Sequence, residues 1–187
     1  MKSRIRLWGW MGMIPGLLVA CACRQKMGQS LPPVRDFQIA RYMGLWYETA
    51  RTPNPFEKGM VSVTAFYSLK GNGTVQVENR GIRNGKFHRI RGIAKVRSKP
   101  DEGDLLVSFF RPFYSLYRIV LLGKEYQYSV VMSSGGKYLW ILSREKELSP
   151  ADRAEILAFL KGNFPAADSL IWNGPVYASP EPVPGRK

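Results

Sequence analysis

The 187-residue chain contains a single histidine, His88, and only two cysteines, Cys21 and Cys23. A catalytic triad would depend on one of these three residues, and a zinc site needs three or four such ligands. This shortage argues against triad and metal catalysis, so we expect no metal and no cofactor. Acidic residues are also scarce. The chain has 14 Asp and Glu against 28 Lys and Arg, a formal net charge of +14.

The first twenty residues have the features of a secretory signal. Three basic residues precede an apolar run, residues 7–20, that is too short to span a bilayer as a helix. This run ends in Leu18-Val19-Ala20-Cys21, which resembles the lipobox of bacterial lipoproteins. In those proteins the signal is removed before the cysteine, and the cysteine is acylated. We therefore expect residues 1–20 to be a lipoprotein signal peptide and Cys21 to be lipidated.

Two further details concern the anchor. Cys23 is a second candidate for acylation, but the residues before it lack the large aliphatic side chain that starts the motif. Ala22 stands where the inner-membrane retention signal would have aspartate. The resemblance thus implies a lipid anchor in the outer membrane of a Gram-negative cell, with the protein facing the periplasm.

That compartment argues against a nucleic-acid partner for the basic residues. They are scattered singly, most densely over residues 80–99. We interpret them either as a solvated face or as a surface that attracts anionic lipid headgroups.

Composition divides the mature chain into three parts. Residues 21–36 include Pro32 and Pro33 and suit an extended, lipidated tether. Residues 173–187 contain four prolines and are expected to form a flexible tail. The folded unit is therefore expected over residues 37–172.

Turn signals recur within this unit at hairpin spacing, and the runs between them are rich in Val, Ile, Tyr, Phe and Trp. This pattern predicts consecutive antiparallel strands, which either pack as two sheets or close into a barrel. One helix is also expected, with Ser149 as N-cap, Pro150 at its first position, and an apolar face that docks outside the sheet. The eight expected strands cover about residues 45–52, 60–69, 73–81, 86–98, 104–110, 116–122, 126–132 and 137–144.

Several segments in order along the chain resemble the lipocalin family. Gly44-Leu45-Trp46-Tyr47-Glu48 resembles its first signature, and Tyr138-Leu139-Trp140-Ile141-Leu142-Ser143-Arg144 resembles its third, in the form found in bacterial members. The second signature is poorly matched, because Leu122-Gly123-Lys124-Glu125-Tyr126 keeps little beyond the tyrosine. The resemblance implies an all-β fold, an eight-stranded antiparallel up-and-down β-barrel with one C-terminal α-helix packed outside.

The resemblance also assigns structural roles to Gly44, Trp46 and Arg144. In lipocalins the arginine packs across the tryptophan at the floor of the barrel, a cation–π contact. Because strand side chains alternate between faces, Trp140 and Leu142 should share the inward face with Arg144. Leu139 and Ile141 should then face the helix.

The same alternation predicts a ligand pocket inside the barrel. Glu48 is unusual there, and we expect either a buried carboxyl with a raised pKa or a partner such as Tyr67 or Asn79. In lipocalins the loop after the first strand, here residues 52–59, covers the mouth as a lid. The expected ligand-binding residues are Glu48, Ala50, Val63, Ala65, Tyr67, Val77, Asn79, Val107, Phe109, Tyr138 and Trp140.

Function follows from the resemblance. It implies a non-enzymatic protein that binds fatty acids or lysophospholipids and stores or transports them, and a homodimer is possible. One alternative is an isomerase or de-epoxidase on the same fold, with Glu48 as general acid. The other is a scavenger of haem or pigment.

Overall fold

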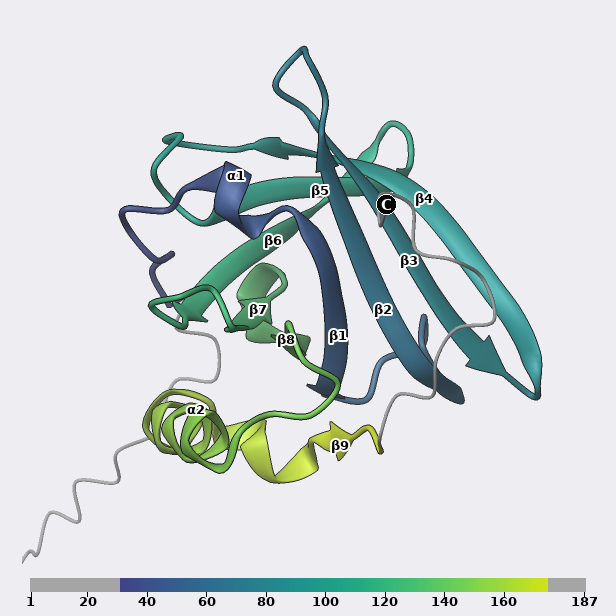
Figure 1. The fold of residues 1–187 in the computed structure, drawn as a ribbon, viewed down its shortest axis with the longest axis vertical. Helices are drawn as coiled ribbons and strands as arrows, with labels where there is room; N and C mark the ends of the chain where they lie inside the picture. The colour runs from purple at the N-terminus through teal and green to yellow at the C-terminus, as the bar shows by residue number, and fades with distance from the viewer. Residues whose placement is uncertain (1–30, 175–187) are drawn as a thin grey trace, which may run out of the picture.

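The computed structural model describes residues 31–174, so the expected signal peptide, Cys21 and most of the expected tail lie outside it. Consecutive strands pair antiparallel, and β1 pairs with both β8 and β2, which closes the sheet into a barrel (Figure 1). The predicted eight-stranded barrel is confirmed. Its strands are β1 (Gly44–Arg51), β2 (Met60–Leu69), β3 (Val75–Arg83), β4 (Lys86–Val96), β5 (Asp104–Phe110), β6 (Phe113–Leu122), β7 (Tyr128–Met132) and β8 (Leu139–Ser143).

Strand alternation divides the apolar side chains into two cores. Trp140 and Leu142 of β8 pack into the interior of the barrel with Trp46. Leu139 and Ile141, on the opposite face of the same strand, pack under the C-terminal helix. The alternation predicted for β8 is therefore correct.

The helix α2 (Pro150–Asn163) lies outside the barrel, as expected (Figure 1). The hydroxyl of Ser149 caps it by accepting a hydrogen bond from the backbone N–H of Asp152 at 3.1 Å. Ile156 and Leu160 are fully buried against the barrel wall. Leu157, the residue after Ile156, lies at the edge of this face and is 40% exposed.

The strand register shifts at four places in the barrel, and two of these shifts change which side chains face inward. In β1, Glu48 pairs with Leu142 but Ala50 pairs with Ile141, so the register shifts at Thr49. The extra residue turns Ala50 outward, into the core beneath α2, which contradicts its predicted place in the pocket. A second shift in β2, between Val61 and Thr64, leaves Val61 outside the barrel.

The chain on either side of the barrel is attached to it. Before β1, residues 31–36 were expected to be part of a tether, yet Val34 exchanges backbone hydrogen bonds with Gly103 and Ile119. After α2, the backbone N–H of Asn173 donates to the carbonyl of Thr49 at 2.9 Å. The remaining elements are the helix α1 (Ile39–Tyr42), the 3-10 turns η1 (Ser134–Gly136) and η2 (Pro165–Ser169), and the strand β9 (Ile171–Trp172), which pairs with β1.

Within residues 31–174, no helix is both long enough and apolar enough to cross a membrane.

Candidate functional site

One end of the barrel is closed by a cation–π contact. The guanidinium of Arg144 lies 3.8 Å from the centre of the Trp46 ring. It also donates hydrogen bonds of 2.8 Å to the carbonyls of Leu45 and Arg41. Gly44 is required here by its backbone, because its φ of +97° suits glycine, while a Cβ would meet Arg144 Nη1 only at ordinary contact distance. These three residues therefore seal the end where β1 begins.

The inner side of Trp46 carries a cluster of tyrosines. The ring of Tyr42 lies 4.7 Å from that of Trp46. Its hydroxyl is 2.8 Å from the hydroxyl of Tyr117, which is itself 2.9 Å from that of Tyr67. Burial raises the pKa of Tyr42 to about 12, so the phenol is neutral at physiological pH. The floor of the interior is thus aromatic, hydrogen-bonded and uncharged.

The walls above this floor are mostly apolar. Ala65, Val77, Val107 and Phe109 all belong to the interior cluster, as the sequence predicted. The amide oxygen of Asn79 is buried and has no hydrogen-bond partner within the described part of the chain. Asn79 is therefore a polar group available to a ligand.

Val63 also faces inward, because its side chain lies 3.2 Å from the position that a Cβ on Gly81 would take. Gly81 belongs to the same face of β3 as Val77 and Asn79, since residues two apart on a strand share a face.

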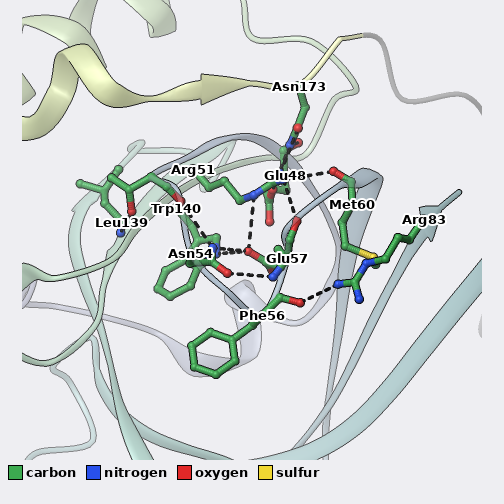
Figure 2. A network of polar contacts seen from close by, with 11 residues as sticks. Glu48, Arg51, Asn54, Phe56, Glu57, Met60, Arg83, Leu139, Trp140 and Asn173 are labelled. Atoms are coloured by element: carbon green, nitrogen blue, oxygen red, sulfur yellow. Dashed lines mark hydrogen bonds and ion pairs between the residues drawn. The ribbon is translucent and has the colours of Figure 1, made fainter.

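The opposite end of the barrel is covered by the loop of residues 52–59, in the position expected of a lid. Trp140 donates from its indole Nε1 to a carboxylate oxygen of Glu57 in this loop at 2.9 Å (Figure 2). Tyr138 packs beside it, with ring centroids 6.1 Å from Trp140 and 6.0 Å from Phe56 of the loop. Trp140 and Tyr138 therefore lie beneath the lid, at the mouth.

A buried charged cluster joins this lid to β1. The guanidinium of Arg51 donates to Glu48 Oε1 at 2.7 Å and to the carbonyls of Glu57 and Met60 at 3.0 and 3.1 Å (Figure 2). Asn173 donates to the same Glu48 oxygen at 2.9 Å. Arg51 and Glu48 are only 3% and 2% exposed. Arg51 thus connects the strand, the lid and the segment after β9.

Glu48 is a buried carboxyl with a raised pKa, one of the two expectations. Burial, reinforced by the charge of Glu57, raises its pKa to about 8 and outweighs the lowering by Arg51 and Asn173. The polar partners proposed from the sequence, Tyr67 and Asn79, are not the ones that bind it.

Sequence reasoning missed Arg51 altogether. In a regular strand, residues three apart face opposite sides, so an inward Glu48 would turn Arg51 outward. The bulge at Thr49 reverses this, and no residue pattern in the sequence signals the bulge.

Comparison with known proteins identifies the family. A family model described as a lipocalin-like domain matches residues 37–173 of the chain. The chain belongs to the lipocalin family. This lipocalin is 36% identical over 158 residues to outer membrane lipoprotein Blc of Escherichia coli strain K12, covering 83% of the chain and 89% of that protein. It is 40% identical over 121 residues to the protein of the same name from Vibrio cholerae, covering 63% and 71% of the two chains.

Solved structures agree on the fold of this lipocalin. Insecticyanin from the tobacco hornworm Manduca sexta superimposes with a TM-score of 0.66 at 20% identity, covering 77% of this chain and 84% of that one. At that identity the likeness concerns the fold alone. Family membership, together with the barrel interior described above, gives this lipocalin a small-molecule binding role of the lipocalin type.

Proposed function

We propose that this lipocalin binds fatty acids or lysophospholipids inside its barrel and stores or transports them at the outer membrane, to which Cys21 anchors it on the periplasmic side. The main support for the proposal is that the two ends of the interior differ in polarity. One end is a neutral aromatic floor sealed by Arg144, and the other is a mouth with the charged side chains of Arg51 and Glu57.

An amphiphile fits this distribution in one orientation. Its acyl chain would lie along the apolar walls, where each buried methylene contributes about 0.8 kcal/mol before the cost of ordering the ligand. Its polar headgroup would remain at the mouth, near the buried charges and the indole of Trp140.

The binding proposal is tested by native mass spectrometry and thermal-shift measurements with lysophosphatidylethanolamine and oleate. We expect one ligand per chain and a rise in melting temperature. Ala65→Phe, which fills the interior, should weaken binding. Ser68→Phe, on the outward face of the same strand, is the matched control and should bind as the unmodified chain does. Absence of binding to any amphiphile would refute the proposal.

The anchor is tested separately. Cys21→Ser should abolish labelling with alkyne palmitate and release the protein from outer-membrane fractions into the soluble periplasm, since stable anchoring needs the acyl chains. Labelling that persists in Cys21→Ser and disappears in Cys23→Ser would move the anchor to Cys23.

No contact within residues 31–174 favours the enzymatic or scavenger alternatives. The carboxyl of Glu48, the expected general acid, accepts hydrogen bonds from Arg51 and Asn173 and does not pair with Tyr67. Turnover of a bound lipid that disappears in Glu48→Gln would revive the enzymatic alternative.

A further inference from the structure

Three phenylalanines point into solvent at the mouth of the barrel, the end opposite Arg144, which we call the open end. Phe56, in the lid loop, is 72% exposed. Phe110 and Phe113 end β5 and begin β6, pair across the turn between these strands, and are 72% and 77% exposed. Figure 2 shows the Phe56 ring turned away from the charged cluster, while its carbonyl accepts a hydrogen bond from Arg83 at 2.9 Å. Large apolar side chains that are grouped at one end of a molecule, and not scattered singly, suit an interaction surface.

The two ends of the barrel also differ in charge. The four segments that join strands at the open end, residues 52–59, 83–86, 110–113 and 133–138, carry five cations and one carboxylate. That carboxylate, Glu57, is turned inward and bound to Trp140 and Asn54. The segments at the closed end, residues 69–75, 97–103, 123–127 and 144–149, carry six cations and five carboxylates. Positive charge is therefore concentrated around the exposed phenylalanines.

The chain length before the barrel allows this end to reach the membrane that would hold the anchor. The carbonyl of Leu31 accepts a hydrogen bond from Arg118 of β6 at 3.1 Å. From there, five residues of strand, about 17 Å, lead to Phe113. The ten peptide units from Cys21 to Leu31 can span up to about 33 Å. An acyl chain on Cys21 and the rings at the mouth can thus lie in one membrane surface.

We propose that the open end, through Phe56, Phe110 and Phe113 and the cations around them, docks on an anionic phospholipid surface. The rings enter the interface between headgroups and acyl chains, and the cations contact the phosphates. This inference rests on the proposed anchor and ligand, and it gives the ligand a direct path between membrane and barrel. Figure 1 shows α2 packed against the other side of the barrel, away from the β5–β6 turn, so α2 remains in water.

The test uses the full-length acylated protein in vesicles of phosphatidylethanolamine and phosphatidylglycerol in which a fraction of the lipid carries brominated acyl chains. Phe113→Trp places a fluorophore at the mouth. Leu157→Trp places one at an exposed apolar position on α2 and is the matched control. The emission added by Phe113→Trp should be lost in the brominated vesicles, and the emission added by Leu157→Trp should persist. High salt, or phosphatidylcholine alone, should weaken the quenching at position 113.

The docking proposal would be overturned if bromination removed the same fraction of the added emission at positions 113 and 157. Quenching at position 157 alone would overturn it as well. Flotation of the vesicles and binding of lysophosphatidylethanolamine are measured on the same samples. If the protein floats and binds ligand while position 113 stays unquenched, the docking is wrong and the proposed function stands. If the protein neither floats nor binds ligand, the proposed function itself has failed.

Discussion

Replacing Glu48 by glutamine should change how stability depends on pH. Burial raises the pKa of this carboxyl from its ordinary value of 4.5 to about 8 in the folded protein. The fold therefore prefers the protonated form, and the group stabilises the native state fully below pH 4.5. This stabilisation is lost as the pH rises toward 8, because the unfolded chain releases the proton at lower pH than the folded chain does.

The size of the effect follows from linkage. One group that binds a proton in the native state and not in the unfolded state changes the free energy of unfolding by about 1.4 kcal/mol per pH unit. Between pH 5.5 and 7.5, Glu48 should thus lower the stability of the unmodified chain by up to about 3 kcal/mol. Glutamine keeps the oxygen that accepts hydrogen bonds from Arg51 and Asn173, but it does not titrate. The part of the pH dependence of stability that comes from Glu48 should therefore disappear in the variant.

Urea unfolding at pH 5.5, 6.5 and 7.5, followed by circular dichroism, measures this difference. Glu125→Gln is the control, because that carboxyl is 85% exposed and pairs with Arg41 at the surface, at 3.3 Å. Its profile should run parallel to that of the unmodified chain. Parallel profiles for Glu48→Gln, or stability of the unmodified chain that grows relative to the variant as pH rises, would refute the reasoning. The first result would mean that Arg51 keeps the carboxyl ionised throughout this pH range, as it is in the unfolded chain.

Three further predictions concern the closed end and the mouth. Arg144→Ala should lower the free energy of unfolding by about 2–4 kcal/mol, because it removes the contact on Trp46 and two hydrogen bonds to carbonyls, as chemical denaturation can measure. Gly44→Ala should cost about 1 kcal/mol or more in the same assay, since alanine is strained at a φ of +97°. Trp140→Phe should remove the ligand-dependent change in tryptophan fluorescence, and Trp172→Phe, in the outer core, should leave it intact. The reverse outcome would show that Trp140 does not face the ligand.

The sequence by itself determined the strands and the helix, and its resemblance to lipocalins implied that the strands close into a barrel. β3 begins with apolar and polar residues in alternation, and β8 is a short apolar run. Turn residues separate the strands at hairpin spacing, so local chemistry specifies where each strand lies. The helix could be predicted for the same reason, because Ser149 and Pro150 act on the backbone next to them. The contact of Arg144 with Trp46 was accessible only through the resemblance to lipocalins, since the two residues are far apart in the chain.

Only the tertiary structure decided what lies at the mouth. Alternation along one strand predicts which side chains face inward only while the strand is regular. After a bulge, the direction of each side chain depends on which residues of the neighbouring strand the backbone pairs with. One extra residue at Thr49 moved Ala50 out of the barrel and brought Arg51 in. The partners of Arg51 then come from the lid and from Asn173, 122 residues away, and no local pattern encodes a pairing at that separation.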